Sequence, residues 1–168
     1  MSDLFVVTFD DETRAAQALD SVKQLQAADQ LDLDDAVIAV KSERGRVRIQ
    51  QTVDPSTETT TISGGWWGLL IGLLLGGPIG GLVGGLAAGA VLGRLIDLGV
   101  DDAFIKDVGR RLDPGSAALF VLVKGGDTDA LHAMLERSGG AILKTELSDA
   151  ARQMLADTAS GAAGDAGE

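Results

Sequence analysis

The sequence has no cysteine, no tyrosine and a single histidine, and these absences exclude several kinds of chemistry. Without cysteine the chain has no disulfide, no thiol nucleophile and no thiolate ligand for a metal, a composition compatible with a reducing cytosol. His132 has no second histidine or cysteine with which to share a metal ion, so the sequence predicts an ordinary surface or boundary residue. We therefore expect no metal site and no cofactor.

Positive charge is also scarce. The chain has 14 lysine and arginine residues against 25 aspartate and glutamate residues, a net charge of −11. Nucleic acid is excluded as the main partner because phosphate binding needs a surplus of basic side chains. The N-terminus lacks the basic start of a secretory signal and soon reaches Asp10, Asp11 and Glu12, so the bulk of the chain is expected in the cytoplasm.

Ionisable side chains are missing altogether from residues 59–93. Glycines recur there at four-residue spacing in two rows, and each row lies on one face of a helix. The first row is Gly64, Gly68, Gly72, Gly76, Gly80 and Gly84, and the second is Gly77, Gly81, Gly85, Gly89 and Gly93. Such a glycine zipper leaves a bare groove that another helix can approach closely, so we expect these glycines to pack helices.

This stretch is a poor helix in water, because each glycine costs about 1 kcal/mol relative to alanine in a helix interior. In hydrocarbon the backbone must bond to itself, so the same residues are driven into helix. A flexible linker is the alternative, but linkers favour polar residues and lack the leucines found here. The pattern therefore favours apolar helices covered by lipid or by other subunits.

Strands and helices are predicted on both sides of the glycine-rich stretch. Continuous or alternating apolar residues predict strands at 4–9, 36–40, 47–51, 117–123 and 142–147, with the third strand joined to the second as a hairpin. Helices are predicted to begin at Asp10 or Asp11, at Asp101 and Asp102, and at Asp127 or Thr128, and a brief helix is predicted through Met154 and Leu155.

Removing the glycine-rich stretch leaves two strand-helix-strand units, the halves of a ferredoxin-like α+β sandwich. The predicted order is a first half at 1–53, a connector at 54–63, a glycine-zipper apolar helical hairpin at 64–99, a second half at 100–156 and a disordered acidic tail at 157–168. The most continuously apolar strands, 4–9 and 117–123, should be central. Neither half is stable alone, so both must lie on one side of any membrane.

This requirement favours a hairpin over a single membrane pass. One helix from Trp66 to Gly93 would be about 42 Å long and would separate the halves. A turn at Gly76, Gly77 and Pro78 keeps them together. Arms of roughly 12 to 16 residues are short for a span, so we expect partial insertion or packing among copies, with Trp66 and Trp67 as interface anchors.

Three elements make the sequence resemble a known family. They are residues 64–72 (GGWWGLLIG), residues 98–106 (LGVDDAFIK) and residues 112–123 (LDPGSAALFVLV), of which the Leu-Asp-Pro-Gly-Ser start is the most specific. The chain is similar, from Leu4 to about Leu155, to the bacterial predicted membrane proteins of unknown function, domain of unknown function 1269. The resemblance implies a small membrane-associated bacterial protein, and it supplies no activity and no functional residues.

Other candidates for chemistry have plainer explanations. The acidic groups at residues 10–12, 32–35 and 101–102 could bind Mg²⁺ or Ca²⁺, but helix caps and solvated loops account for them. Ser63, Ser116 and Ser148 lack the surroundings of a catalytic nucleophile. The glycines lack the Gly-Lys-Ser/Thr ending of a phosphate-binding loop. Enzymatic activity is therefore not expected.

Two basic clusters are local exceptions on this acidic chain. They consist of Lys41, Arg44, Arg46 and Arg48 around the hairpin, and Lys106, Arg110 and Arg111 on the helix after the glycine-rich stretch. One interpretation is contact with anionic lipid headgroups. The other is a solvated strand face and a favourable interaction with a helix dipole. The sequence leaves both open.

These observations lead to three hypotheses about function. The first is a non-enzymatic, membrane-associated protein that self-associates through its glycine-zipper hairpin, with a structural or envelope-stress role, at the bacterial inner membrane with its bulk on the cytoplasmic side. The second is a soluble high-order homo-oligomer with the hairpins buried between subunits. The third is a regulatory domain that binds an unidentified small molecule, by analogy with other ferredoxin-like sheets.

Overall fold

The computed structural model describes residues 2–44, 47–52, 70–71, 93–155 and 157. For residues 47, 48 and 50–52 it describes the backbone only. The predicted connector, most of the predicted hairpin and nearly all of the predicted tail lie outside the described residues.

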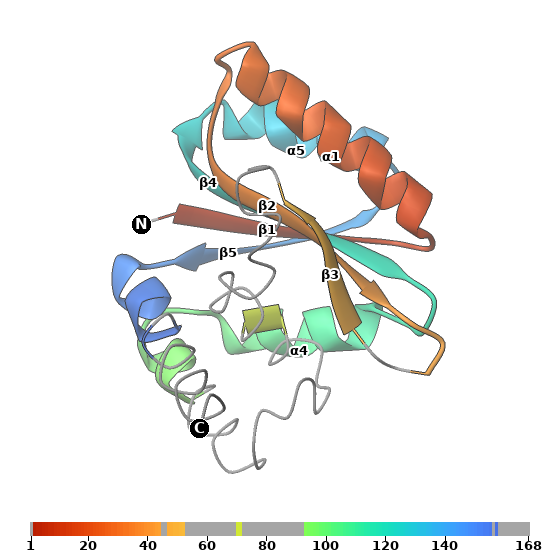
Figure 1. Cartoon of the computed structure of the whole chain (residues 1–168). Coiled ribbons are helices and arrows are strands. Elements are labelled where there is room, and N and C mark those ends of the chain that lie inside the picture. Colours follow the sequence, from red (N-terminus) through yellow and green to blue (C-terminus); the bar gives the residue numbers. More distant parts are fainter. Residues whose placement is uncertain (1, 45–46, 53–69, 72–92, 156, 158–168) are drawn as a thin grey trace, which may run out of the picture.

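Five strands form one sheet in the order β3-β2-β4-β1-β5 (Figure 1). They are β1 (Ser2–Phe9), β2 (Leu31–Lys41), β3 (Val47–Thr52), β4 (Ala117–Gly126) and β5 (Ala141–Leu147). Each pair of neighbouring strands is antiparallel. The α+β class is therefore confirmed, and so is the hairpin between β2 and β3.

The two halves of the chain share this sheet. β1 from the N-terminal half lies between β4 and β5 from the C-terminal half, and β4 lies between β1 and β2. The two most apolar strands are central, as predicted, and the paired residues Val6 and Phe120 are both 0% exposed. The segments before and after the glycine-rich stretch are thus hydrogen-bonded to one another.

One face of the sheet is covered by α1 (Glu12–Ala27) and α5 (Thr128–Arg137), which lie above it in Figure 1. α1 begins where predicted, because the side chain of Asp11 accepts a hydrogen bond from the backbone N of Arg14 at 2.8 Å. The apolar stripes of both helices are buried against the sheet through Ala15, Ala18, Leu19, Val22, Leu131 and Leu135.

The opposite face carries a second helical layer, which lies below the sheet in Figure 1. It consists of α4 (Asp102–Arg111) and the helical residues 93–97 and 149–155. α4 begins at the predicted cap, where the side chain of Asp101 accepts a hydrogen bond from the backbone N of Ala103 at 2.9 Å. The layer buries Phe104, Ile105, Val108, Leu112, Ala151, Met154 and Leu155 in one cluster with the sheet. Both α4 and the helix at residues 149–155 were predicted, but not the face of the sheet that they cover.

β2 begins earlier than the predicted strand at residues 36–40. Leu31 and Leu33 are buried while Asp32 is exposed, so the alternation of a strand already runs through these residues. The expectation that residues 32–35 lie in a solvated loop is wrong. Asp34 forms ion pairs with Arg152 and, at 3.5 Å, with Lys124.

No helix among the described residues combines the length and the apolar character needed to cross a membrane.

Candidate functional site

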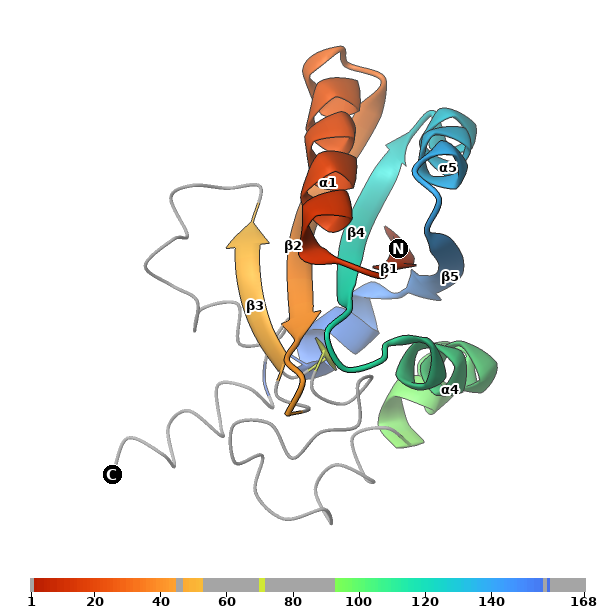
Figure 2. The same cartoon turned by 90° about the vertical axis from the view of Figure 1, so that its right-hand side faces the viewer.

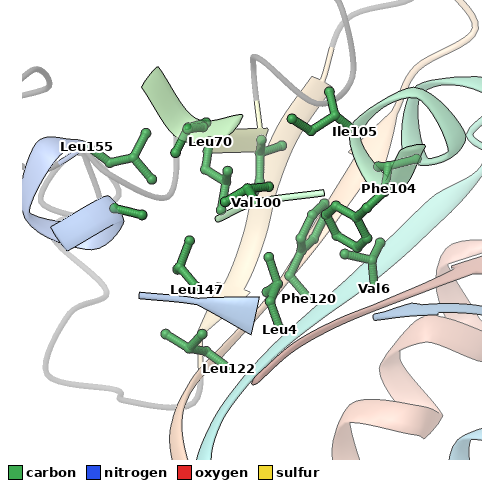
Figure 3. Close-up of a cluster of buried hydrophobic side chains, with 14 of the residues drawn as sticks. Leu4, Val6, Leu70, Val100, Phe104, Ile105, Phe120, Leu122, Leu147 and Leu155 are labelled. Carbon is green, nitrogen blue, oxygen red and sulfur yellow. The ribbon is translucent and has the colours of Figure 1, made fainter. Parts of the chain in front are cut away.

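Two places in and just after the glycine-rich stretch are buried on the face of the sheet that α4 covers. Leu70 and Ile71 within the stretch are each 1% exposed, and Leu95 just after it is 0% exposed. They belong to the cluster that contains side chains of β1 and β4. Figure 3 shows Leu70 facing Val100 within this cluster. We call Leu70, Ile71 and Leu95 the insertion roots, and residues 72–92 between them the insertion.

Hydrogen bonds also fix the chain where it leaves the insertion. Ser148 Oγ donates to the backbone O of Leu98 at 3.1 Å. The backbone N of Asp101 donates to Oγ1 of Thr145, a β5 residue that is 7% exposed, at 3.4 Å. The segment after the insertion is therefore tied to β5 and to the start of the helical residues 149–155.

Sequence reasoning missed the insertion roots. Leu70 and Ile71 stand among similar residues such as Leu69 and Leu73, so no local signal distinguishes them. Leu95 did carry a signal, because it follows the last regularly spaced glycine and has apolar residues three and five positions later, at Leu98 and Val100.

Most of the predicted hairpin residues cannot be placed against this geometry. The glycines of both rows before Gly93, the turn at Gly76, Gly77 and Pro78, and the anchors Trp66 and Trp67 lie outside the described residues. Gly93 is described and exposed, and nothing in the described structure lies within 4 Å of the position that a Cβ would take there.

The structure joins the two segments that carry the predicted basic clusters. Lys41 Nζ, at the end of β2, donates a hydrogen bond to the backbone O of Leu112, just after α4, at 3.3 Å. The backbones are joined as well, because Gly115 N donates to Lys41 O at 2.7 Å and Lys41 N donates to Ser116 O at 2.9 Å. Figure 2 shows the chain passing from α4 into β4 beside the end of β2.

Three arginines lie exposed around this junction: Arg44, Arg110 and Arg111. With Lys41 they form what we call the basic end. Lys106, one turn earlier on α4, is instead paired with Asp102 at 2.9 Å. Arg46 and the side chain of Arg48 lie outside the described residues.

Ser63 lies outside the described residues, and the remaining candidates that the structure describes show no catalytic arrangement. His132 is exposed, as predicted, with Nδ1 3.7 Å from Glu136 Oε1. Ser148 Oγ accepts a hydrogen bond from the backbone N of Ala151 at 3.1 Å, which is the geometry of a helix cap. Within the described ranges no group of histidine, aspartate or glutamate side chains could hold a metal ion.

These features define an α+β protein in which one antiparallel sheet is shared by two halves of the chain, covered by helices on both faces, with an apolar insertion rooted on one of them. The chain belongs to the family described as proteins of unknown function, DUF1269, which it matches over residues 61–160. The match covers the insertion, its roots, α4, β4, α5 and β5. Comparisons with curated proteins and with solved structures found no match.

The turn at residues 112–116, the most specific part of the family resemblance, has a structural role in this chain. Gly115 has a φ of +87°, a conformation that side chains with a Cβ rarely adopt. In this conformation its backbone N reaches Lys41 O. The turn therefore aligns the start of β4 with the end of β2.

Proposed function

We propose that this chain is a non-enzymatic, membrane-associated protein that self-associates through a glycine-zipper hairpin formed by the insertion. In this proposal the ferredoxin-like sheet and its helices lie outside the bilayer, on the cytoplasmic side of a bacterial inner membrane. The role of the assembly is structural or belongs to the envelope stress response.

The observation that carries the proposal is the burial of both insertion roots on one face of one sheet. β4, which follows the insertion, pairs with β1 and β2, which precede it. A single pass through a bilayer would pull these strands to opposite sides and break their hydrogen bonds. The shared sheet therefore supports a segment that enters the membrane and returns.

The length of the insertion supports shallow entry. With the predicted turn at Gly76 to Pro78, the arms at residues 72–75 and 79–92 would be about 6 Å and about 21 Å long as helices, and both are shorter than a hydrocarbon core of about 30 Å. Because Leu70 and Ile71 belong to the core, the first arm is shorter than the sequence alone suggested.

A short hairpin also suits the second hypothesis, a soluble homo-oligomer. Arms that cannot span a bilayer can still bury their leucines between copies of the chain, and the bare glycine rows permit close packing there. The two hypotheses differ in what covers the insertion: lipid in the first and sister subunits in the second.

Co-sedimentation of the full-length chain with membranes tests the proposal. Leu74→Lys with Leu82→Lys places two charges in the insertion, and each lysine at a helix centre in a bilayer costs about 3 kcal/mol. We expect the double variant to lose membrane binding by more than about tenfold. Gln17→Lys with Ala133→Lys adds the same charge on exposed positions of α1 and α5 and should bind as the wild type does.

Two results would argue against the membrane. Equal recovery of the wild type and the insertion variant in the soluble fraction removes the claim of membrane association. A uniform high-mass particle purified without detergent, and dissociated by the insertion variant but not by the control, favours the soluble homo-oligomer.

A further inference from the structure

The helical layer on the α1 and α5 side is strongly acidic. Its two helices and the residues that flank them carry eight acidic residues but three basic ones. The acidic residues are Asp10, Asp11, Glu12, Asp20, Asp29, Asp127, Asp129 and Glu136, and the basic ones are Arg14, Lys23 and Arg137. An anionic surface would repel this layer.

The α4 side is close to balanced, because residues 93–113 and 148–155 carry six acidic and five basic residues. The acidic ones are Asp97, Asp101, Asp102, Asp107, Asp113 and Asp149, and the basic ones are Arg94, Lys106, Arg110, Arg111 and Arg152. At the basic end, the hydrogen bond from Lys41 to Leu112 joins the segment that carries Arg44 to the end of α4, which carries Arg110 and Arg111. The same two segments carry Glu43, Asp107 and Asp113, so four positive charges stand against three negative ones. On a chain with a net charge of −11, this end is where an anionic partner is attracted.

The stability of α4 explains the positions of Arg110 and Arg111 but not that of Arg44. Arg110 and Arg111 lie in the last turn of α4, where cations interact favourably with the helix dipole. Arg44 lies beyond β2 on another segment, so the dipole does not explain it. None of the three arginines forms an ion pair with a described residue, whereas Lys106 on the same helix does.

The insertion roots lie in the same layer as α4. Leu70 and Leu95 share one buried cluster with Ile105 and Val108, which project from α4. An apolar segment that enters a bilayer from these roots brings the α4 side toward the headgroups and leaves the acidic α1 and α5 side in water.

We propose that the basic end binds the anionic headgroups of a lipid bilayer, with the α4 layer facing the membrane and the α1 and α5 layer facing away. This inference rests on the proposed function, because the insertion sets which side of the sheet approaches the bilayer. Each arginine near an anionic surface contributes about fivefold to binding, and salt weakens the effect.

Vesicle flotation of the full-length chain tests the inference. One set of vesicles is phosphatidylcholine, and the other is phosphatidylcholine mixed with phosphatidylglycerol. The wild type should bind the mixed vesicles more tightly, with the difference shrinking as salt is added. A variant with Arg44→Gln, Arg110→Gln and Arg111→Gln should lose binding to mixed vesicles by roughly a hundredfold and keep its binding to neutral ones.

The matched control is Arg14→Gln with Lys23→Gln and Arg137→Gln, which removes the same charge from the acidic layer. It should bind mixed vesicles within a few-fold of the wild type. Equal binding of the wild type to both kinds of vesicle, or equal losses in the two triple variants, overturns the inference and leaves the proposed function intact. Absence of wild-type binding to either vesicle overturns both.

Discussion

At the scale of single residues, two neighbouring glycines at the end of β4 differ in whether a side chain fits at their position. Gly126 has a φ of +99°, and a Cβ there would lie 2.7 Å from Gln30 O and 2.8 Å from Leu31 Cα. Nothing lies within 4 Å of a Cβ added at Gly125. We predict that Gly126→Ala lowers the free energy of unfolding by about 2–4 kcal/mol, and that Gly125→Ala changes it by less than about 1 kcal/mol. Urea denaturation measures both, and equal effects would contradict the account.

A second residue-scale prediction concerns the ion pair between Asp34 on β2 and Arg152 on the final helical residues. Their side chains are 15% and 31% exposed, so water screens the pair less than an exposed one. Arg152→Gln should lower the free energy of unfolding by about 1–2 kcal/mol. Lys106→Gln breaks an exposed pair within α4 and should cost less than about 0.5 kcal/mol. If both variants unfold at the same urea concentration, the ion pair between Asp34 and Arg152 stabilises the fold no more than an exposed pair does.

At the scale of elements, the insertion roots should behave as core residues. Leu70 is 1% exposed and belongs to the same buried cluster as the apolar residues of α4, so Leu70→Ala should lower the free energy of unfolding by about 2–4 kcal/mol. Ile96, also close to the insertion, is 39% exposed, and Ile96→Ala should cost less than about 1 kcal/mol. Urea unfolding of the sheet, followed by circular dichroism, compares the two. If Leu70→Ala lowers the free energy of unfolding no more than Ile96→Ala does, Leu70 does not contribute to the core of the sheet.

The elements themselves were largely predictable because their signals are local. Asp11, Asp101 and Asp127 mark the starts of helices, and each accepts a backbone hydrogen bond in the structure. The early start of β2 was missed although Leu31, Asp32 and Leu33 alternate as a strand does. The partner of Asp34, Arg152, lies 118 residues away, and no local pattern reveals it.

The helices of the second layer were predicted after Asp101 and through Met154 and Leu155, but their position on the second face of the sheet was not. In β1 the side chains of Leu4 and Val6 point to one core cluster, and those of Phe5 and Val7 point to the other. A strand that is apolar at every position needs cover on both faces. If helices covered only one face of the sheet, every second apolar side chain of β1 would face water.

At the scale of the whole molecule, the shared sheet determines what the insertion can do. Strands from both sides of residues 72–92 are neighbours in one hydrogen-bonded sheet, and the roots lie on one face of it. Any membrane contact made by the insertion must therefore leave α1 and α5 on the same side of the bilayer. The glycine spacing alone could not predict that the insertion roots lie on one face of the sheet, because the spacing does not show where Leu70 and Leu95 are buried.

The most direct test is the accessibility of single cysteines to a membrane-impermeant maleimide in sealed vesicles, since the natural chain has no cysteine to interfere. The sites are Gln17→Cys on α1, Ala133→Cys on α5 and Pro78→Cys in the insertion. The account predicts that positions 17 and 133 react from the same side, and that position 78 reacts only after detergent is added. Labelling of 17 and 133 from opposite sides, or labelling of 78 as fast as 17, would contradict it.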